Sequence, residues 1–124
     1  LQFKNRENYG VLMFDAWTSQ LSDEIVAIMV KVGDIILLVD LKTTKDSKGG
    51  FWYAQQLKQV IDFLKTKDIT IIGLSCDNCA VNVAAYKLLC GMPDVLVNQL
   101  TDEQRKMVKL DKPIIILRCM AHVL

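Results

Sequence analysis

The segment Ile69–Leu89 constrains the fold more than any other part of the chain. It opens with an apolar, β-branched run over Ile69–Leu74, turns at Ser75–Asn78 and then carries apolar residues at helical spacing. These are Val81, Ala84, Ala85 and Leu88. A strand that leads straight into a helix is the unit of α/β folds, and ligands gather at the C-terminal ends of such strands. Asp77 stands at that point, so we expect it to be a metal ligand with Asp15, on an earlier strand, as its partner.

Other segments of the chain show strand or helix patterns of their own. The predicted strands are Tyr9–Trp17, Glu24–Val32, Ile35–Thr43, Ile69–Ser75 and Ile114–Arg118. The predicted helices are Phe51–Lys67, with Ser47 as a possible cap, Asn78–Cys90, with Gly91 as its stop, and a short helix from the Thr101 capping box to about Leu110. Gly33-Asp34 is a hairpin signal, so the first three strands form an antiparallel meander.

The order of these elements predicts an α/β fold with a mixed five-stranded sheet and helices on both faces. Helices between the third and fourth strands, and between the fourth and fifth, imply crossovers and a parallel second half. This is the element order of the ribonuclease H-like fold, in which the first strand lies beside the fourth. That neighbourhood would bring Asp15 close to Asp77.

Asp15 is the one charged residue in a strand that is otherwise almost wholly apolar. Such a run predicts burial on both faces, and a buried carboxylate has to be paired, protonated or bound to metal. A structural Asp bonded to neighbouring backbone is the alternative. For Asp77 the alternative is a helix N-cap, a role that can coexist with metal binding.

Composition narrows the class of protein. A chain of 124 residues is one domain or part of one, and its first residue, Leu, suggests a piece of a longer protein without a signal peptide. The net charge of +1 does not indicate nucleic-acid binding, since a domain that binds DNA by itself is usually more basic. The apolar run Ile25–Val30 is far too short to cross a membrane. Four cysteines fit reduced thiols in an intracellular protein.

Three short motifs in order resemble those of hAT-type transposases. Phe14–Ser19 contains the pattern D-x-W-T-S, Cys76–Asn82 looks like T-D-N-A-x-N with Cys for Thr, and Cys119–Leu124 looks like C-x-x-H-x-L. The match runs from Tyr9 onward. The resemblance implies that residues 1–124 are the N-terminal part of one ribonuclease H-like transposase core. It also implies a nuclear protein whose full-length form binds DNA and forms homo-oligomers.

In that family two Asp and a distant Glu hold two Mg²⁺ or Mn²⁺ ions for cutting and joining DNA phosphodiesters. The resemblance assigns the first two places to Asp15 and Asp77, and puts His122 in support of the active site. The Glu lies beyond a helical insertion after the C-x-x-H segment, so the triad is incomplete here. The full-length parent is then expected to be an enzyme, and this piece alone to be inactive.

Three other functions stay open on the sequence. A domesticated remnant would bind DNA or protein without catalysis. Cys76-x-x-Cys79, between a strand and a helix, could be a thiol redox pair. The same pair with Cys119 and His122 could form a Cys₃His zinc site. Against both thiol hypotheses, Cys79 could simply be a small core residue.

Overall fold

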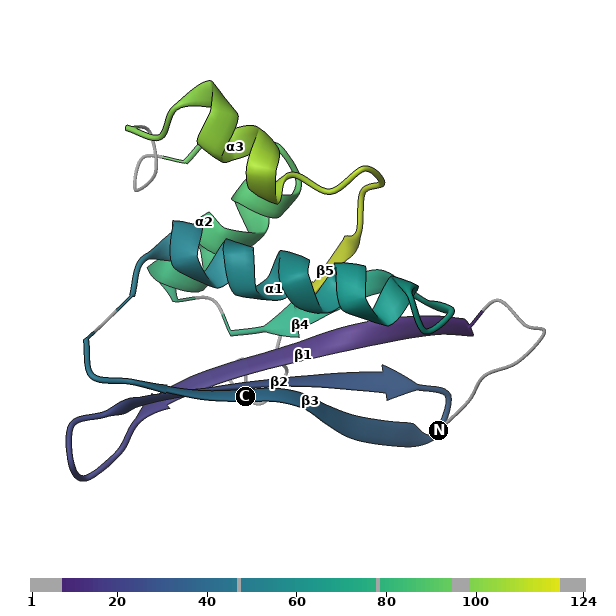
Figure 1. The fold of residues 1–124 in the computed structure, drawn as a ribbon, viewed down its shortest axis with the longest axis horizontal. Helices are drawn as coiled ribbons and strands as arrows, with labels where there is room; N and C mark the ends of the chain where they lie inside the picture. The colour runs from purple at the N-terminus through teal and green to yellow at the C-terminus, as the bar shows by residue number, and fades with distance from the viewer. Residues whose placement is uncertain (1–7, 47, 78, 95–98, 119–124) are drawn as a thin grey trace.

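The computed structural model describes residues 8–46, 48–77, 79–94 and 99–118. The chain forms five strands and three helices in the predicted order (Figure 1). The strands are β1 (Asn8–Thr18), β2 (Glu24–Val32), β3 (Ile35–Thr44), β4 (Ile69–Cys76) and β5 (Ile115–Arg118). The helices are α1 (Gly50–Lys65), α2 (Ala80–Leu89) and α3 (Asp102–Val108).

The five strands form one mixed sheet in the order β3-β2-β1-β4-β5. The meander β1-β2-β3 is antiparallel, and β4 pairs in parallel with both β1 and β5. The predicted α/β class and the five-stranded mixed sheet are confirmed, and the arrangement is consistent with a ribonuclease H-like fold. The central position of β1, beside β4, is confirmed as well.

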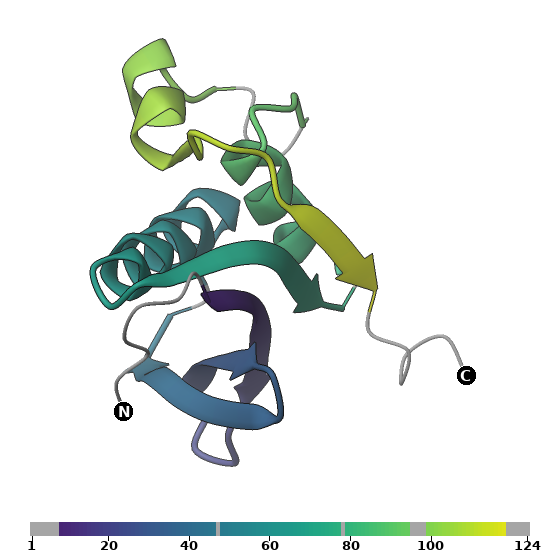
Figure 2. The same cartoon turned by 90° about the vertical axis from the view of Figure 1, so that its right-hand side faces the viewer.

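The three helices lie together on one side of the sheet (Figures 1 and 2). Helices on both faces were expected, but the described helices share a single face. The physical reason is handedness. The chain moves across the sheet in the same direction from β3 to β4 as from β4 to β5, and right-handed crossovers then place both connecting helices on the same side.

The core fills the space between the sheet and these helices. Leu12 and Phe14 of β1 are part of it, as is Leu57 of α1, and the Phe14 ring packs edge-on against Tyr53 of α1. The opposite side of the sheet, which we call the open face, carries large apolar side chains that are between 43% and 64% exposed. They are Tyr9, Trp17, Ile36, Leu38, Leu41, Ile72, Ile115 and Leu117.

The open face corrects one expectation for β1. The strand was predicted to be buried on both faces, yet Asp15 is exposed and Trp17 is 45% exposed. The apolar residues of β1 alternate between the core and the open face, and both sets look alike in the sequence. Hydrophobicity alone could not show that one of the two faces lacks a cover of helices.

Helix boundaries follow the capping signals where these are strong. Thr101 forms the predicted capping box with Gln104, and Gly91 ends α2 at a φ of +72°, with Met92 N–H donating to the Lys87 carbonyl at 2.7 Å. The first turn of α2 starts later than predicted, at Ala80, with Cys79 as N-cap. The predicted cap Ser47 lies outside the described residues.

Within the described ranges, no helix has the length and apolarity needed to cross a bilayer.

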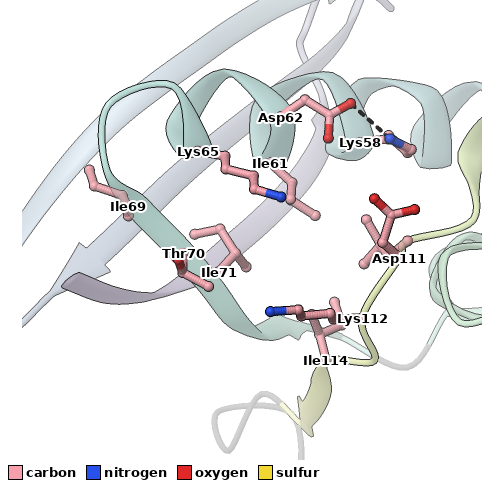
Figure 3. A pocket seen from close by; sticks show the side chains of 11 residues that line it. Lys58, Ile61, Asp62, Lys65, Ile69, Thr70, Ile71, Asp111, Lys112 and Ile114 are labelled. Atoms are coloured by element: carbon pink, nitrogen blue, oxygen red, sulfur yellow. Dashed lines mark hydrogen bonds and ion pairs between the residues drawn. The ribbon is translucent and has the colours of Figure 1, made fainter. Parts of the chain in front are cut away.

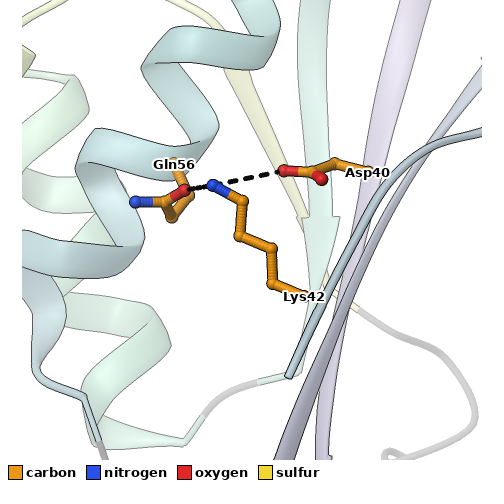
Figure 4. A network of polar contacts seen from close by, with 3 residues as sticks. All are labelled: Asp40, Lys42 and Gln56. Atoms are coloured by element: carbon orange, nitrogen blue, oxygen red, sulfur yellow. Dashed lines mark hydrogen bonds and ion pairs between the residues drawn. The ribbon is translucent and has the colours of Figure 1, made fainter. Parts of the chain in front are cut away.

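A polar contact ties the edge strand β3 to α1 beneath the helix (Figure 4). Lys42 of β3 donates to the side-chain oxygen of Gln56, which is only 7% exposed, and lies 3.5 Å from Asp40. Burial of an amide without a partner would be costly. The lysine therefore satisfies the amide oxygen, while Asp40 is held on the helix side of β3 and away from Asp15.

Helices α1 and α2 approach each other closely at Gly50, the first residue of α1. A Cβ atom at this position would lie 2.8 Å from the Cβ of Ala84 and 3.3 Å from the backbone nitrogen of Ala85, both in α2. Glycine is needed here for space rather than for backbone conformation. The neighbouring Gly49 has open space around its Cβ position.

We predict that Gly50→Ala lowers the free energy of unfolding by about 1–3 kcal/mol, because the added methyl forces α1 away from α2. Gly49→Ala is the matched control and should cost less, because a Cβ there meets nothing and only the weaker N-cap preference of alanine counts against it. Urea denaturation followed by circular dichroism measures both. Equal stability of the two variants would contradict the close approach.

Candidate carboxylate site

Asp15 and Asp77 lie toward the C-terminal ends of two neighbouring parallel strands. Asp15 is in β1, and Asp77 directly follows β4. Met13 of β1 pairs with Ser75 of β4, and each aspartate comes two residues after its member of that pair. This is the last pair between the two strands among the described residues, so both aspartates lie just past the paired stretch of β1 and β4. Both line one depression, together with Met13, Met29 and Ser75 among its other residues. The structure therefore brings together the two residues that the sequence predicted as partners.

The Asp77 carboxylate is held by the start of α2. Its Oδ1 accepts a hydrogen bond from the backbone N–H of Cys79 at 3.2 Å and one from the side-chain amide of Asn82 at 2.7 Å. Asn82 is only 6% exposed. Asp77 is not the N-cap that the alternative hypothesis expected, because Cys79 holds that position, but these two bonds fix the orientation of its carboxylate.

A second depression opens on the other side of Asp77, toward the helices. Its polar lining includes Glu24 of β2, Lys48 before α1, Tyr53 of α1 and Asn82. The Tyr53 hydroxyl donates to Glu24 Oε1, and the Lys48 ammonium lies 6.0 Å from the centre of the Trp52 ring. Asp77 stands between the two depressions and belongs to both.

Sequence reasoning assigned no role to Asn82, Glu24, Lys48 or Tyr53. Asn82 carried a usable signal, because an Asp at a strand end and an Asn five residues later, in the second turn of the following helix, can meet. Glu24, Lys48 and Tyr53 carried none, since only the three-dimensional fold brings the start of β2 beside the start of α1.

Two cysteines lie near the site, one buried and one exposed. Cys76 is buried in the core on the helix side of β4, and Cys79 is exposed at the start of α2. Partial burial raises the pKa of the Cys79 thiol, and the hydrogen bond and negative charge of Asp77 raise that pKa further. A protonated thiol is a poor nucleophile and a poor metal ligand. This disfavours the redox hypothesis for Cys79.

The donor set fits a hard cation in part. Two carboxylates from adjacent strands are oxygen ligands that Mg²⁺ or Mn²⁺ prefers. Over the described ranges, no three His, Cys, Asp or Glu side chains are grouped so that they could hold a metal ion. Asp15 and Asp77 could offer two oxygen ligands, and the described residues hold no third carboxylate grouped with them.

Three residues of the sequence hypotheses cannot be placed. Asn78, Cys119 and His122 lie outside the described residues. The supporting role predicted for His122 and the Cys₃His zinc hypothesis therefore stay predictions.

Comparison with known proteins adds no relative: no family model, no curated protein and no solved structure matches the chain.

We predict that Asn82→Ala lowers the free energy of unfolding by about 1–3 kcal/mol, because a buried donor to a charged carboxylate is lost. A double-mutant cycle with Asp77→Ala, measured by urea denaturation, isolates this pair. The cost of Asn82→Ala should fall by about 1 kcal/mol or more when Asp77 is already absent. An unchanged cost would mean that Asn82 acts through packing alone.

We also predict that alkylation of Cys79 by iodoacetamide accelerates up to a pH above the ordinary thiol pKa, since only the thiolate reacts. Asp77→Asn should shift that profile to lower pH, because it removes the negative charge that disfavours the thiolate. Mass spectrometry of the Cys79 peptide gives the rate. The Cys90 thiol, whose pKa is also raised by burial, is the internal reference and should not respond to Asp77→Asn. A rate that is already maximal at neutral pH would refute the prediction.

Proposed function

We propose that this chain is the N-terminal part of a DDE-type DNA transposase core, in which Asp15 and Asp77 are two of the three carboxylates. The observation that supports this most is that both aspartates, one in β1 and one directly after β4, line the same depression. The D-x-W-T-S and C-D-N-C-A-V-N motifs contain these same two residues.

The chain's own residues would act by position and charge. Asp15, exposed on β1, and Asp77, held by Asn82 and the Cys79 N–H, would present oxygen ligands from two rigid strands. When bound there, a pair of divalent ions would supply Lewis-acid activation of a water or 3′-hydroxyl toward a DNA phosphodiester. His122 is proposed to lie near the scissile phosphate and to support the active site there.

Other parts of this function belong to a longer protein. The third carboxylate, the DNA-binding segments and the contacts for homo-oligomers are proposed to lie beyond this chain. A nuclear location follows from DNA as the substrate.

The test is a Mn²⁺ titration of protein carrying ¹³C-labelled methionine methyl groups. Met13 and Met29 line the depression with the two aspartates, so bound Mn²⁺ should broaden their signals first. Met92 and Met107, on the helical layer and its connections, serve as internal references. We expect weak, saturable binding that Asp15→Asn/Asp77→Asn abolishes.

Glu103→Gln, on the short helix α3, is the control variant and should bind Mn²⁺ like the unaltered protein. Broadening that is equal in the Asp15→Asn/Asp77→Asn variant, or equal at all four methionines, would reject a site at these carboxylates. Asp15 is exposed, and Asp77→Asn keeps an oxygen that can accept from Asn82, so the variant should fold.

The isolated chain should not cut or join DNA, because two carboxylates do not complete a two-metal site. With a net charge of +1 it should also bind DNA poorly at physiological salt. Incubation with Mn²⁺ and a nicked or hairpin DNA measures this. Cleavage that disappears in Asp77→Ala would show a complete site within these residues and a third ligand that the proposal misplaces.

A non-catalytic descendant that binds protein or DNA is the second candidate. The exposed apolar side chains on the open face favour it, because patches of this kind mark interaction surfaces. The Mn²⁺ titration separates the two candidates, since a remnant does not need a cation at Asp15 and Asp77.

A further inference from the structure

A second pocket lies at the opposite end of β4 from the carboxylate site (Figure 3). It is formed by the second half of α1, the start of β4 and the segment before β5. Because β4 spans Ile69–Cys76 at about 3.3 Å per residue, the pocket is roughly 25 Å from Asp77. It is therefore separate from the proposed metal site.

The floor of this pocket is apolar. It is made by Ile61 of α1, Ile69 and Ile71 of β4, and Ile114 before β5. The pocket encloses about 130 Å³, close to the roughly 150 Å³ of an apolar cavity that accommodates benzene. The space suits a hydrocarbon body of about six carbon atoms.

Two lysine side chains reach over that floor from different elements. Figure 3 shows Lys65 extending from α1 and Lys112 from the segment before β5, and both side chains line the pocket. Among the described residues, neither ammonium has a hydrogen bond or an ion pair. The third lysine, Lys58, is already paired with Asp62 at 2.8 Å. Two unpaired cations over an apolar floor match an anion on an apolar body.

Asp111 also lines the pocket, and its negative charge disfavours a ligand that carries more than one negative charge. Its carboxylate has no ion pair with a described residue. Lys65, Lys112 and Asp111 together leave one net positive charge. This favours a monoanion over a dianionic phosphate, and two ammonium groups match the two oxygens of one carboxylate.

We infer that this pocket binds a carboxylate on a compact branched or aromatic hydrocarbon. Such a group occurs in a free short-chain acid and at the C-terminal residue of a peptide. In a peptide, the last amide N–H is an additional donor for Asp111. The inference does not depend on the function proposed for Asp15 and Asp77.

Titration with 4-methylpentanoate and with N-acetyl-leucine tests the inference, followed by NMR of ¹³C-labelled isoleucine methyl groups. For a ligand of about eight heavy atoms we expect a Kd of about 1 mM. The signals of Ile61, Ile69, Ile71 and Ile114 should shift, and that of Ile36 on the open face should not. Tighter binding of N-acetyl-leucine assigns the pocket to a peptide end, and tighter binding of the free acid assigns it to a small molecule.

The neutral isostere 4-methylpentanamide should bind at least about tenfold more weakly, because it lacks the charge. Lys65→Gln/Lys112→Gln should weaken carboxylate binding by a similar factor. Lys31→Gln, an exposed lysine on β2, is the matched control and should have no effect. The inference is overturned if the pocket isoleucines do not shift, if the amide binds as well as the acid, or if the double variant binds normally.

Discussion

The parallel pairing of β1 with β4 is the interaction on which both the fold and the candidate site depend. Leu12 and Leu74 are cross-strand neighbours and are fully or almost fully buried against the helices. A shift of either strand by one residue would turn these leucines toward solvent, so burial fixes the register. Two residues beyond the last pair of this register, Asp15 and Asp77 line one depression at the end of the strands. Core packing therefore determines the geometry of two side chains that do not belong to the core.

Most of the fold could be predicted from the sequence, because its signals are local. The strand from Glu24 to Val32 has the predicted bounds, and the Thr101 capping box and the stop at Gly91 are where their chemistry places them. The side of the sheet that each helix covers is not a local property. It follows from the order of strands combined with right-handed crossovers, and here it places the described helices on one face.

The candidate site was predictable only as far as its strand positions. Asp15 and Asp77 could be paired from the expected strand order, but their surroundings could not. An apolar β1 suggested a buried Asp15, whereas the open face leaves this carboxylate exposed to water. The reason is that the sequence of a strand shows how polar each of its two faces is, but it does not show which other elements cover those faces. Glu24, Lys48 and Tyr53 line the second depression beside Asp77. Their presence there likewise depends on tertiary contacts between the start of β2 and the start of α1.

Exposure of Asp15 has a physical consequence for any cation at this edge. The attraction between opposite charges is weak in water and grows as the effective dielectric constant falls. Asp77 is already oriented by Asn82 and the Cys79 N–H, whereas no hydrogen bond to a described residue holds Asp15. One carboxylate is thus pre-organised and the other is solvated. A cation would bind at this edge mainly through the fixed geometry of Asp77, and a cover over the open face would strengthen that binding by removing water from Asp15.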